Sequence, residues 1–419
     1  MRLHRLFSLA AVALVGCSAG GAKDDTPAFV NGADSGPGGG GDDGGLHFDD
    51  SGGGLGGDVS GKPPLDPTKD NDGDGYTYAD DCDDANPAVN PGAYDVVGDK
   101  VDNDCDGKAD EVDKCDPGLA LTSKTAADYA KALDLCKTTT EGATGKDKRW
   151  GVISATISTT DGGAAPWARQ YGIETTFGSV LKPKGNAAMA VLSTGSARTP
   201  GQPDYIKPLT LDPTDKNTGN ENSAPPGWPK NSAGCADPLT PGMANDSVVL
   251  KLRIRVPTNA NAFSYDFDFY TSEYHDYVCT AFNDTYIALL TTKAKLDPKN
   301  NGNISFDKKG DPVNVNSGFF EVCSPGSFGG KSFACALGRT ELSGTGFDGD
   351  PDPAGGSADE DGATSWLETK APVVPGEIID ISFMIWNTSD HILQSTVLLD
   401  NWQWSAAPTS GPPSTDRPK

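Results

Sequence analysis

The chain has 419 residues and a formal net charge of −25, which is long enough for two or three domains. Its acidity and the lack of a clustered basic face exclude nucleic acid as an expected partner, because phosphate binding needs concentrated lysine and arginine. With 36% hydrophobic residues, 52 glycines and 31 prolines, part of the chain is not expected to pack into a core.

The first 17 residues have the features of an export signal. Arg2 and Arg5 precede an apolar run, Leu6–Val15, that is too short for a permanent membrane helix. The run ends in LVGC, which resembles a bacterial lipobox, so we expect cleavage before Cys17 and lipid attachment to its thiol. Ser18 after the cysteine favours the outer membrane in lipoproteins of this kind. The alternative is a plain secretory signal with an unrelated cysteine.

Residues 18–65 consist mostly of glycine, aspartate, serine and proline. Such a segment has almost no large apolar side chain to bury, so it cannot offset the entropy lost on ordering. We predict a disordered tether that holds the folded part away from the membrane.

An acidic module is predicted over residues 66–114, because residues 66–116 carry 17 acidic and four basic side chains. Two twelve-residue stretches within it follow the pattern of a calcium loop, in which alternate oxygens fold around a glycine. We expect about two Ca²⁺ ions. The predicted ligands are Asp70, Asp72, Asp74, the carbonyl of Tyr76 and Asp81, and then Asp102, Asp104, Asp106, the carbonyl of Lys108, Asp110 and Asp113.

An EF-hand is not expected, because prolines on both sides of the first loop leave no room for flanking helices. Copper is disfavoured as well, since residues 66–116 contain neither histidine nor methionine and soft metals prefer such ligands. A third interpretation is that the Asp-Gly pattern forms solvated turns without any metal.

The spacing DxDGDGY…DCDDxxPxxxPGA…DNDCDGxxDE over about residues 70–111 resembles the metal-binding motif of myxobacterial surface proteins. That family is named after a copper-binding outer-membrane protein. Its members usually carry an additional cysteine where this chain has Val96 and Val97. The resemblance therefore implies metal binding, but neither the family's usual disulfide pattern nor a thiol-linked copper site.

Eight cysteines remain once Cys17 is set aside, an even number that fits four disulfides in an exported protein. No CxxC spacing occurs, which disfavours zinc and thiol-redox chemistry. Local spacing suggests the pairs Cys82–Cys105 and Cys115–Cys136. Proximity in the sequence suggests Cys323–Cys335, which leaves Cys235–Cys279 by elimination.

Residues 115–407 are predicted to be mainly β, preceded by one short helix. The helix would begin with a capping box at Thr125 and Asp128 and run to about Leu135. Apolar and polar residues alternate over residues 248–256 and 263–269, and apolar runs cover residues 286–290, 378–386 and 397–404. We therefore expect a jelly-roll-like β-sandwich, followed by a disordered tail over residues 408–419.

Five motifs in this part resemble, in order, those of the choice-of-anchor L domain, over roughly residues 115–405. Members are exported bacterial surface proteins with differing anchors, and the resemblance implies no known catalytic activity. The motifs are Trp150–Ala155, Val256–Ala260, Phe269–Tyr274, Phe282–Asp284 and Val397–Asn401.

No catalytic motif such as HExxH, GxSxG or a phosphate-binding loop occurs, so we do not expect an enzyme. A secreted hydrolase using His275 or His391 is one alternative, and a copper-acquisition protein is another. Trp402 and Trp404 could stack on sugars or pack in the core. Four residues near strand ends could bind another Ca²⁺ or a sugar, or could serve turn hydrogen bonding: Glu273, Asp276, Asn283 and Asp284.

Together these patterns predict a lipid-anchored, cell-surface calcium-binding protein whose β-sandwich acts in binding or adhesion. The expected partners are the membrane, through the lipid, and an unidentified extracellular glycan, matrix component or protein.

Overall fold

The computed structural model describes residues 66–164, 167–208, 221–233, 235, 242–328, 330–349, 361–409 and 411–418. The predicted signal, Cys17 and the tether lie outside these ranges. All described residues belong to one compact unit, Pro63–Lys419. No helix among them is long and apolar enough to cross a bilayer.

One antiparallel sheet has the strand order β1-β5-β13-β7-β8, with β4 pairing with the start of β5. Its longest strands lie at its centre, where β5 and β13 pair from Arg255 opposite Ile378 to Val248 opposite Ile385. The strands are β1 (Gly151–Ser158), β4 (Glu221–Ser223), β5 (Met243–Arg255), β7 (Thr285–Thr291), β8 (Val313–Asn314) and β13 (Ile378–Asn387).

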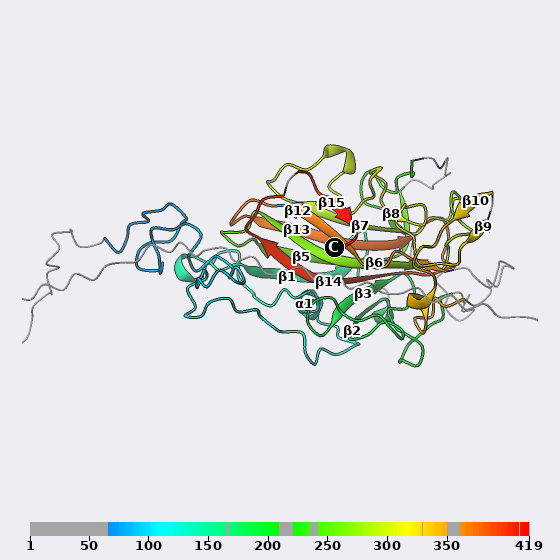
Figure 1. Cartoon of the computed structure of the whole chain (residues 1–419), viewed down its shortest axis with the longest axis horizontal. Coiled ribbons are helices and arrows are strands. Elements are labelled where there is room, and N and C mark those ends of the chain that lie inside the picture. The colour runs from blue at the N-terminus through cyan, green and yellow to red at the C-terminus, as the bar shows by residue number, and fades with distance from the viewer. Residues whose placement is uncertain are drawn as a thin grey trace, which may run out of the picture. The chain divides into compact units, whose positions relative to one another are not determined.

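A second antiparallel sheet has the order β15-β12-β6-β14-β3-β2, with β11 pairing with the end of β6. Figure 1 shows its long strands running in the same general direction as those of the first sheet. The strands are β2 (Tyr171–Glu174), β3 (Met189–Ser193), β6 (Ala262–Thr271), β11 (Gly362–Ala363), β12 (Leu367–Pro372), β14 (Ser395–Ser405) and β15 (Ser414–Asp416); β9 (Gly326–Phe328) and β10 (Lys331–Phe333) form a separate hairpin.

The hydrophobic core lies between the two sheets. Side chains that alternate along β5 and β6 are almost fully buried, as the period of two in the sequence predicts. Rings of the two sheets meet across the interface, with centroids 5.0 Å apart for Tyr265 on β6 with Phe383 on β13 and for Phe267 on β6 with Tyr286 on β7. The predicted mainly β sandwich with one short helix is therefore confirmed.

The helix is shorter than the sequence predicts, and its cap is different. α1 covers Ala126–Lys131, and the side chain of Thr125 makes no capping hydrogen bond. Instead, Ser123 Oγ donates to Asp128 Oδ2 at 2.7 Å. The chain turns after Lys131 because Asp134 adopts a left-handed conformation, with φ of +67°, that a helix cannot continue through. The short 3₁₀ segments are η1 (Gly145–Asp147), η2 (Ala168–Gln170), η3 (Pro298–Asn300) and η4 (Thr340–Leu342).

The predicted disordered tail is wrong over residues 414–417. β15 (Ser414–Asp416) pairs with the edge of β12, and the hydroxyls of Thr369 and Thr415 lie 2.9 Å apart in the interior. An unpaired edge strand exposes backbone donors and acceptors, and the tail satisfies those of β12.

All four predicted disulfides are present. The two in the N-terminal part, Cys82–Cys105 and Cys115–Cys136, have Cα–Cα distances of 5.8 and 5.4 Å. The two in the β-sandwich, Cys235–Cys279 and Cys323–Cys335, have distances of 5.0 and 5.1 Å. Because residues 82–105 contain no helix or strand, the first disulfide is the main covalent constraint on the acidic module.

Candidate metal centre

The acidic module is built from turns that aspartate side chains hold together. Asp70 accepts hydrogen bonds from the backbone amides of Gly73 at 2.6 Å and Gly75 at 3.0 Å. Asp102 does the same for the amides of Asp106 at 3.1 Å and Gly107 at 2.9 Å. Aspartate at the first position of each loop therefore shapes a turn, a common role for this side chain.

The first loop brings three carboxylates together. Oxygens of Asp72, Asp74 and Asp81 lie within 4.8 Å of one another. Each residue has a buried Oδ2 atom without a hydrogen-bond partner in the described chain. Burial, followed by the nearby charges of Asp72 and Asp81, raises the pKa of Asp74 to about 6. We call these three residues the first carboxylate cluster. Asp70, Asp72 and Asp84 form an adjoining group.

A second cluster combines residues from three separate segments of the module. Oxygens of Asp95, Asp104 and Glu111 also lie within 4.8 Å of one another, and each residue has one buried oxygen that no group in the described ranges satisfies. Contact with the Asp95 carboxyl and then burial raise the pKa of Glu111 to about 7. Burial likewise raises the pKa of Asp104. We call this set the second carboxylate cluster.

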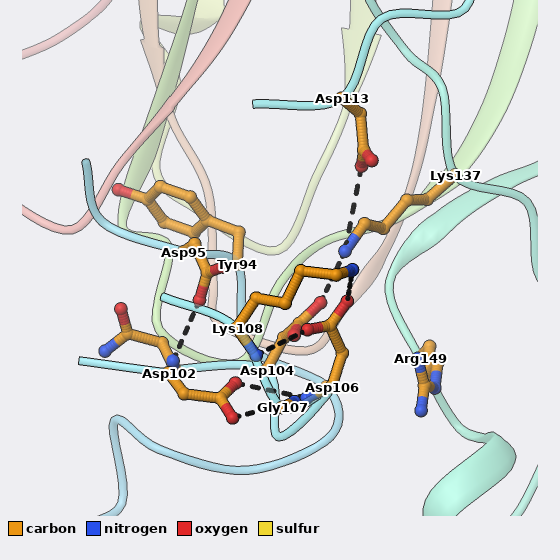
Figure 2. A network of polar contacts seen from close by, with 12 residues as sticks. Tyr94, Asp95, Asp102, Asp104, Asp106, Gly107, Lys108, Asp113, Lys137 and Arg149 are labelled. Atoms are coloured by element: carbon orange, nitrogen blue, oxygen red, sulfur yellow. Dashed lines mark hydrogen bonds and ion pairs between the residues drawn. The ribbon is translucent and has the colours of Figure 1, made fainter. Parts of the chain in front are cut away.

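Lys137 connects the second cluster to the β-sandwich. Its ammonium group contacts Asp104 Oδ2 and lies 3.7 Å from Asp113 Oδ2. Figure 2 shows both carboxylates converging on this one ammonium group, which belongs to the segment between α1 and β1. The lysine leaves Asp104 Oδ1 without a partner in the part of the chain described, so it neutralises the cluster only in part.

The two clusters fit a hard divalent cation. Ca²⁺ binds carboxylate oxygens at 2.3–2.6 Å, so oxygens on opposite sides of one ion lie about 5 Å apart, close to the separation found here. A buried carboxylate oxygen without a partner is costly, and a cation would remove that cost. Asp81 also lies near Cys82 and Cys105, but their sulfurs are joined in a disulfide and offer no thiolate.

Of the other predicted ligands, Asp70, Asp102 and Asp106 also lie in carboxylate groups, whereas the rest have different roles. Tyr76 lies beside the first cluster, where its amide donates to Asp74 Oδ1 at 2.9 Å. Lys108 donates its amide to Asp106 Oδ1 at 3.0 Å, and Asp106 forms a fourth carboxylate group with Asp102 and Asp104. Asp110 accepts from the amides of Gly98 at 2.6 Å and Lys100 at 3.3 Å.

Asp110 and Asp113 thus belong to none of the carboxylate groups found in the described residues, because the chain turns at Asp110 with φ of +62°. Three residues that loop numbering did not select do belong to such groups: Asp84, Asp95 and Glu111. Glu111 ends the DNDCDGxxDE pattern, a signal that could have identified it, whereas Asp95 is brought in only by the fold.

The module is attached to the β-sandwich by hydrogen bonds as well as by Lys137. Asn259 accepts from the amide of Tyr94 at 3.0 Å and donates to its carbonyl at 2.8 Å. Nearby, the amide of Thr258 donates to the carbonyl of Gly92 at 3.0 Å. A Cβ at Gly92 would lie 2.1 Å from the hydroxyl of Tyr76, so the close packing of residue 92 against Tyr76 requires glycine.

The four weaker candidates lie between the end of β6 and the start of β7. Glu273 accepts from the amide of Asp284 at 3.0 Å, and burial raises the pKa of Glu273 to about 8 and that of Asp284 well above its usual range. Asp276 instead faces His275, with 3.0 Å between Oδ1 and Nδ1. Asn283 is buried. The structure therefore brings Glu273 and Asp284 together inside the protein rather than at a solvated loop.

Comparison with known families agrees with this arrangement. A family model described as "Putative metal-binding motif" matches residues 81–111, which include all of the second carboxylate cluster. The model of the choice-of-anchor L domain matches residues 185–403. No curated protein matches the chain. A metal-binding motif followed by a choice-of-anchor domain suggests a cell-surface protein. Because the second match covers more than half of the 419 residues, the chain belongs to the choice-of-anchor L domain family.

Proposed function

We propose that this protein is a lipid-anchored calcium-binding protein of the cell surface, whose β-sandwich acts in binding or adhesion. The observation that carries the calcium part is the pair of carboxylate clusters, each with three buried oxygens that the described chain leaves without a partner. The anchor rests on the lipobox-like sequence that ends at Cys17.

In this proposal, Ca²⁺ supplies positive charge that balances the acidic module. Asp72, Asp74 and Asp81 hold one ion, and the second carboxylate cluster holds the other. Asp104 has a further role, because its second oxygen contacts Lys137 on the sandwich side. Residues that bind the ion therefore also fix the module against the β-sandwich, and a filled site would make that attachment rigid.

The donor atoms favour calcium over copper. Both clusters consist of carboxylate oxygens alone, which suit Ca²⁺, whereas copper prefers imidazole and sulfur ligands. Extracellular calcium modules typically bind at about 10⁻⁴–10⁻³ M, so such a site would be filled outside a cell and emptied by a chelator.

Isothermal titration of residues 18–419 with Ca²⁺, and separately with Cu²⁺, tests the metal. We expect about two equivalents of Ca²⁺. Asp74→Asn and Asp104→Asn should each remove one of them. Asp83→Asn is the matched control, since it deletes a charge from the same module at an exposed position outside both clusters. Heat with Cu²⁺ alone, or with neither ion, would contradict the proposal.

The anchor is tested by expressing the full chain in a Gram-negative host with a radiolabelled fatty acid. Label should enter the wild-type protein, which should fractionate with the outer membrane. The variant Cys17→Ala should lose the label. Without the lipid, this variant should be released from the membrane or retained as an unprocessed precursor. Cys17→Ala protein that still carries the label would contradict lipid attachment at this residue.

A further inference from the structure

A cavity of about 530 Å³ lies where the acidic module meets the β-sandwich. Its size falls within the range of about 300–1,000 Å³ that is usual for small-ligand sites. The sandwich contributes Trp150, directly before β1, and both tryptophans of β14, Trp402 and Trp404. The module contributes Glu111 and Asp113. The cavity therefore combines an aromatic wall with an acidic one.

The aromatic wall is rigid. Trp402 stacks on Phe263 with 4.2 Å between ring centroids. Trp404 packs edge to face against Trp402 at 5.3 Å and against Trp150 at 6.0 Å. Trp402 and Trp150 are only 5% and 8% exposed, whereas Trp404 is half-buried and can offer a ring to a ligand.

All three indole groups carry an unused hydrogen-bond donor. The Nε1 atoms of Trp150, Trp402 and Trp404 are buried and have no acceptor among the described residues. Tryptophan N–H groups usually find a partner when they are buried. Because these atoms have almost no accessible surface, and Trp228 and Trp386 outside the cavity share the feature, the groups that a ligand can reach are the Trp404 ring and the polar side chains of the lining.

The rest of the lining indicates what kind of ligand this is. Asn186, Asn401 and Gln403 supply amides that both donate and accept, and carboxylates next to them accept from hydroxyls. Aromatic faces beside such groups match a saccharide, which has an apolar C–H face and a rim of hydroxyls. Four carboxylates against two lysines in the lining disfavour an acidic saccharide.

We propose that this cavity binds a neutral saccharide, with Trp404 stacking on a sugar ring and the amides and carboxylates of the lining binding its hydroxyls. Glu111 and Asp95 belong both to the lining and to the second carboxylate cluster. An ion in that cluster would fix the acidic wall, so saccharide binding should depend on calcium. This dependence rests on the proposed function; the saccharide site itself rests on the cavity.

The test uses full-length protein in detergent and four neutral tetrasaccharides: cellotetraose, maltotetraose, mannotetraose and chitotetraose. Tryptophan fluorescence should change on titration with at least one of them in the presence of Ca²⁺. Trp404→Ala should weaken that binding by about tenfold or more. Trp404→Phe keeps an aromatic face, so it should weaken binding less. Trp167→Ala, at a half-buried tryptophan outside the cavity, is the control.

Each result decides one part of the proposal. No response to any tetrasaccharide at 10 mM, or tighter binding of tetragalacturonate, would overturn the neutral-saccharide site. Equal effects of Trp404→Ala and Trp167→Ala would place the ligand elsewhere. Binding that persists unchanged in a chelator would overturn the calcium dependence alone. Calcium titration of the same sample shows whether the proposed function holds when the saccharide result is negative.

Discussion

Two neighbouring residues, Asp110 and Glu111, give opposite predictions for calcium binding. Loop numbering makes Asp110 a ligand, whereas the structure directs Asp110 to backbone amides and Glu111 into the second carboxylate cluster. We therefore predict that Glu111→Gln lowers the calcium stoichiometry from two to one. Asp110→Asn should leave it at two, because an asparagine oxygen can still accept from Gly98 and asparagine tolerates the left-handed conformation of this residue.

The size of the effect follows from Coulomb's law. A Ca²⁺ ion about 2.4 Å from a carboxylate oxygen gains about 3 kcal/mol from that charge even in a medium as polar as water. Its loss corresponds to roughly a hundredfold in Kd. A site that binds at about 10⁻⁴–10⁻³ M would then no longer fill in a calorimetric titration.

The same variant has an opposite effect on the metal-free protein. Contact with the Asp95 carboxyl and then burial raise the pKa of Glu111 to about 7, so at pH 8 the carboxyl is mostly ionised in both states and its charge costs more in the folded protein than in the unfolded chain. Glu111→Gln should therefore raise the Tm in a chelator while it removes the stabilisation by calcium. Loss of an ion in Asp110→Asn, with two ions retained in Glu111→Gln, would refute the assignment of the second cluster.

Three further predictions concern stability. Cys82→Ser combined with Cys105→Ser opens a loop with a sequence separation of 23, which should cost about 3 kcal/mol and speed amide exchange in the acidic module; unchanged exchange would count against this role. Burial raises the pKa of Glu174 from 4.5 to about 7, so the carboxyl is protonated in both states below pH 4.5 and stability falls as pH rises towards 7. Glu174→Gln should remove about 3 kcal/mol of this decline in unfolding free energy by pH 8, as measured by urea unfolding. Unfolding free energies of variant and wild type that change in parallel with pH would contradict this prediction. Deletion of residues 411–419 exposes the edge of β12 and should lower the Tm by several degrees, whereas a disordered tail would be removable without effect.

Much of the architecture follows from local sequence. A period of two over β5 and β6 predicts strands, because successive side chains of a strand point to opposite faces, although the structure buries both faces of β6. The four disulfide pairs could be predicted because an exported chain with eight cysteines forms them, and short separations limit the choices. The first carboxylate cluster could also be predicted from the sequence, since Asp72, Asp74 and Asp81 lie within one twelve-residue stretch.

Only the tertiary structure decided the rest. The end of α1 depends on Asp134 taking a left-handed conformation, and β15 forms because β12 offers an unpaired edge, which no local pattern of the tail records. The second cluster joins Asp95 to Asp104 and Glu111 from three separate segments of the chain. Loop spacing describes ligands that are neighbours in sequence, whereas a disulfide-linked module without helices selects its ligands by how its turns pack together.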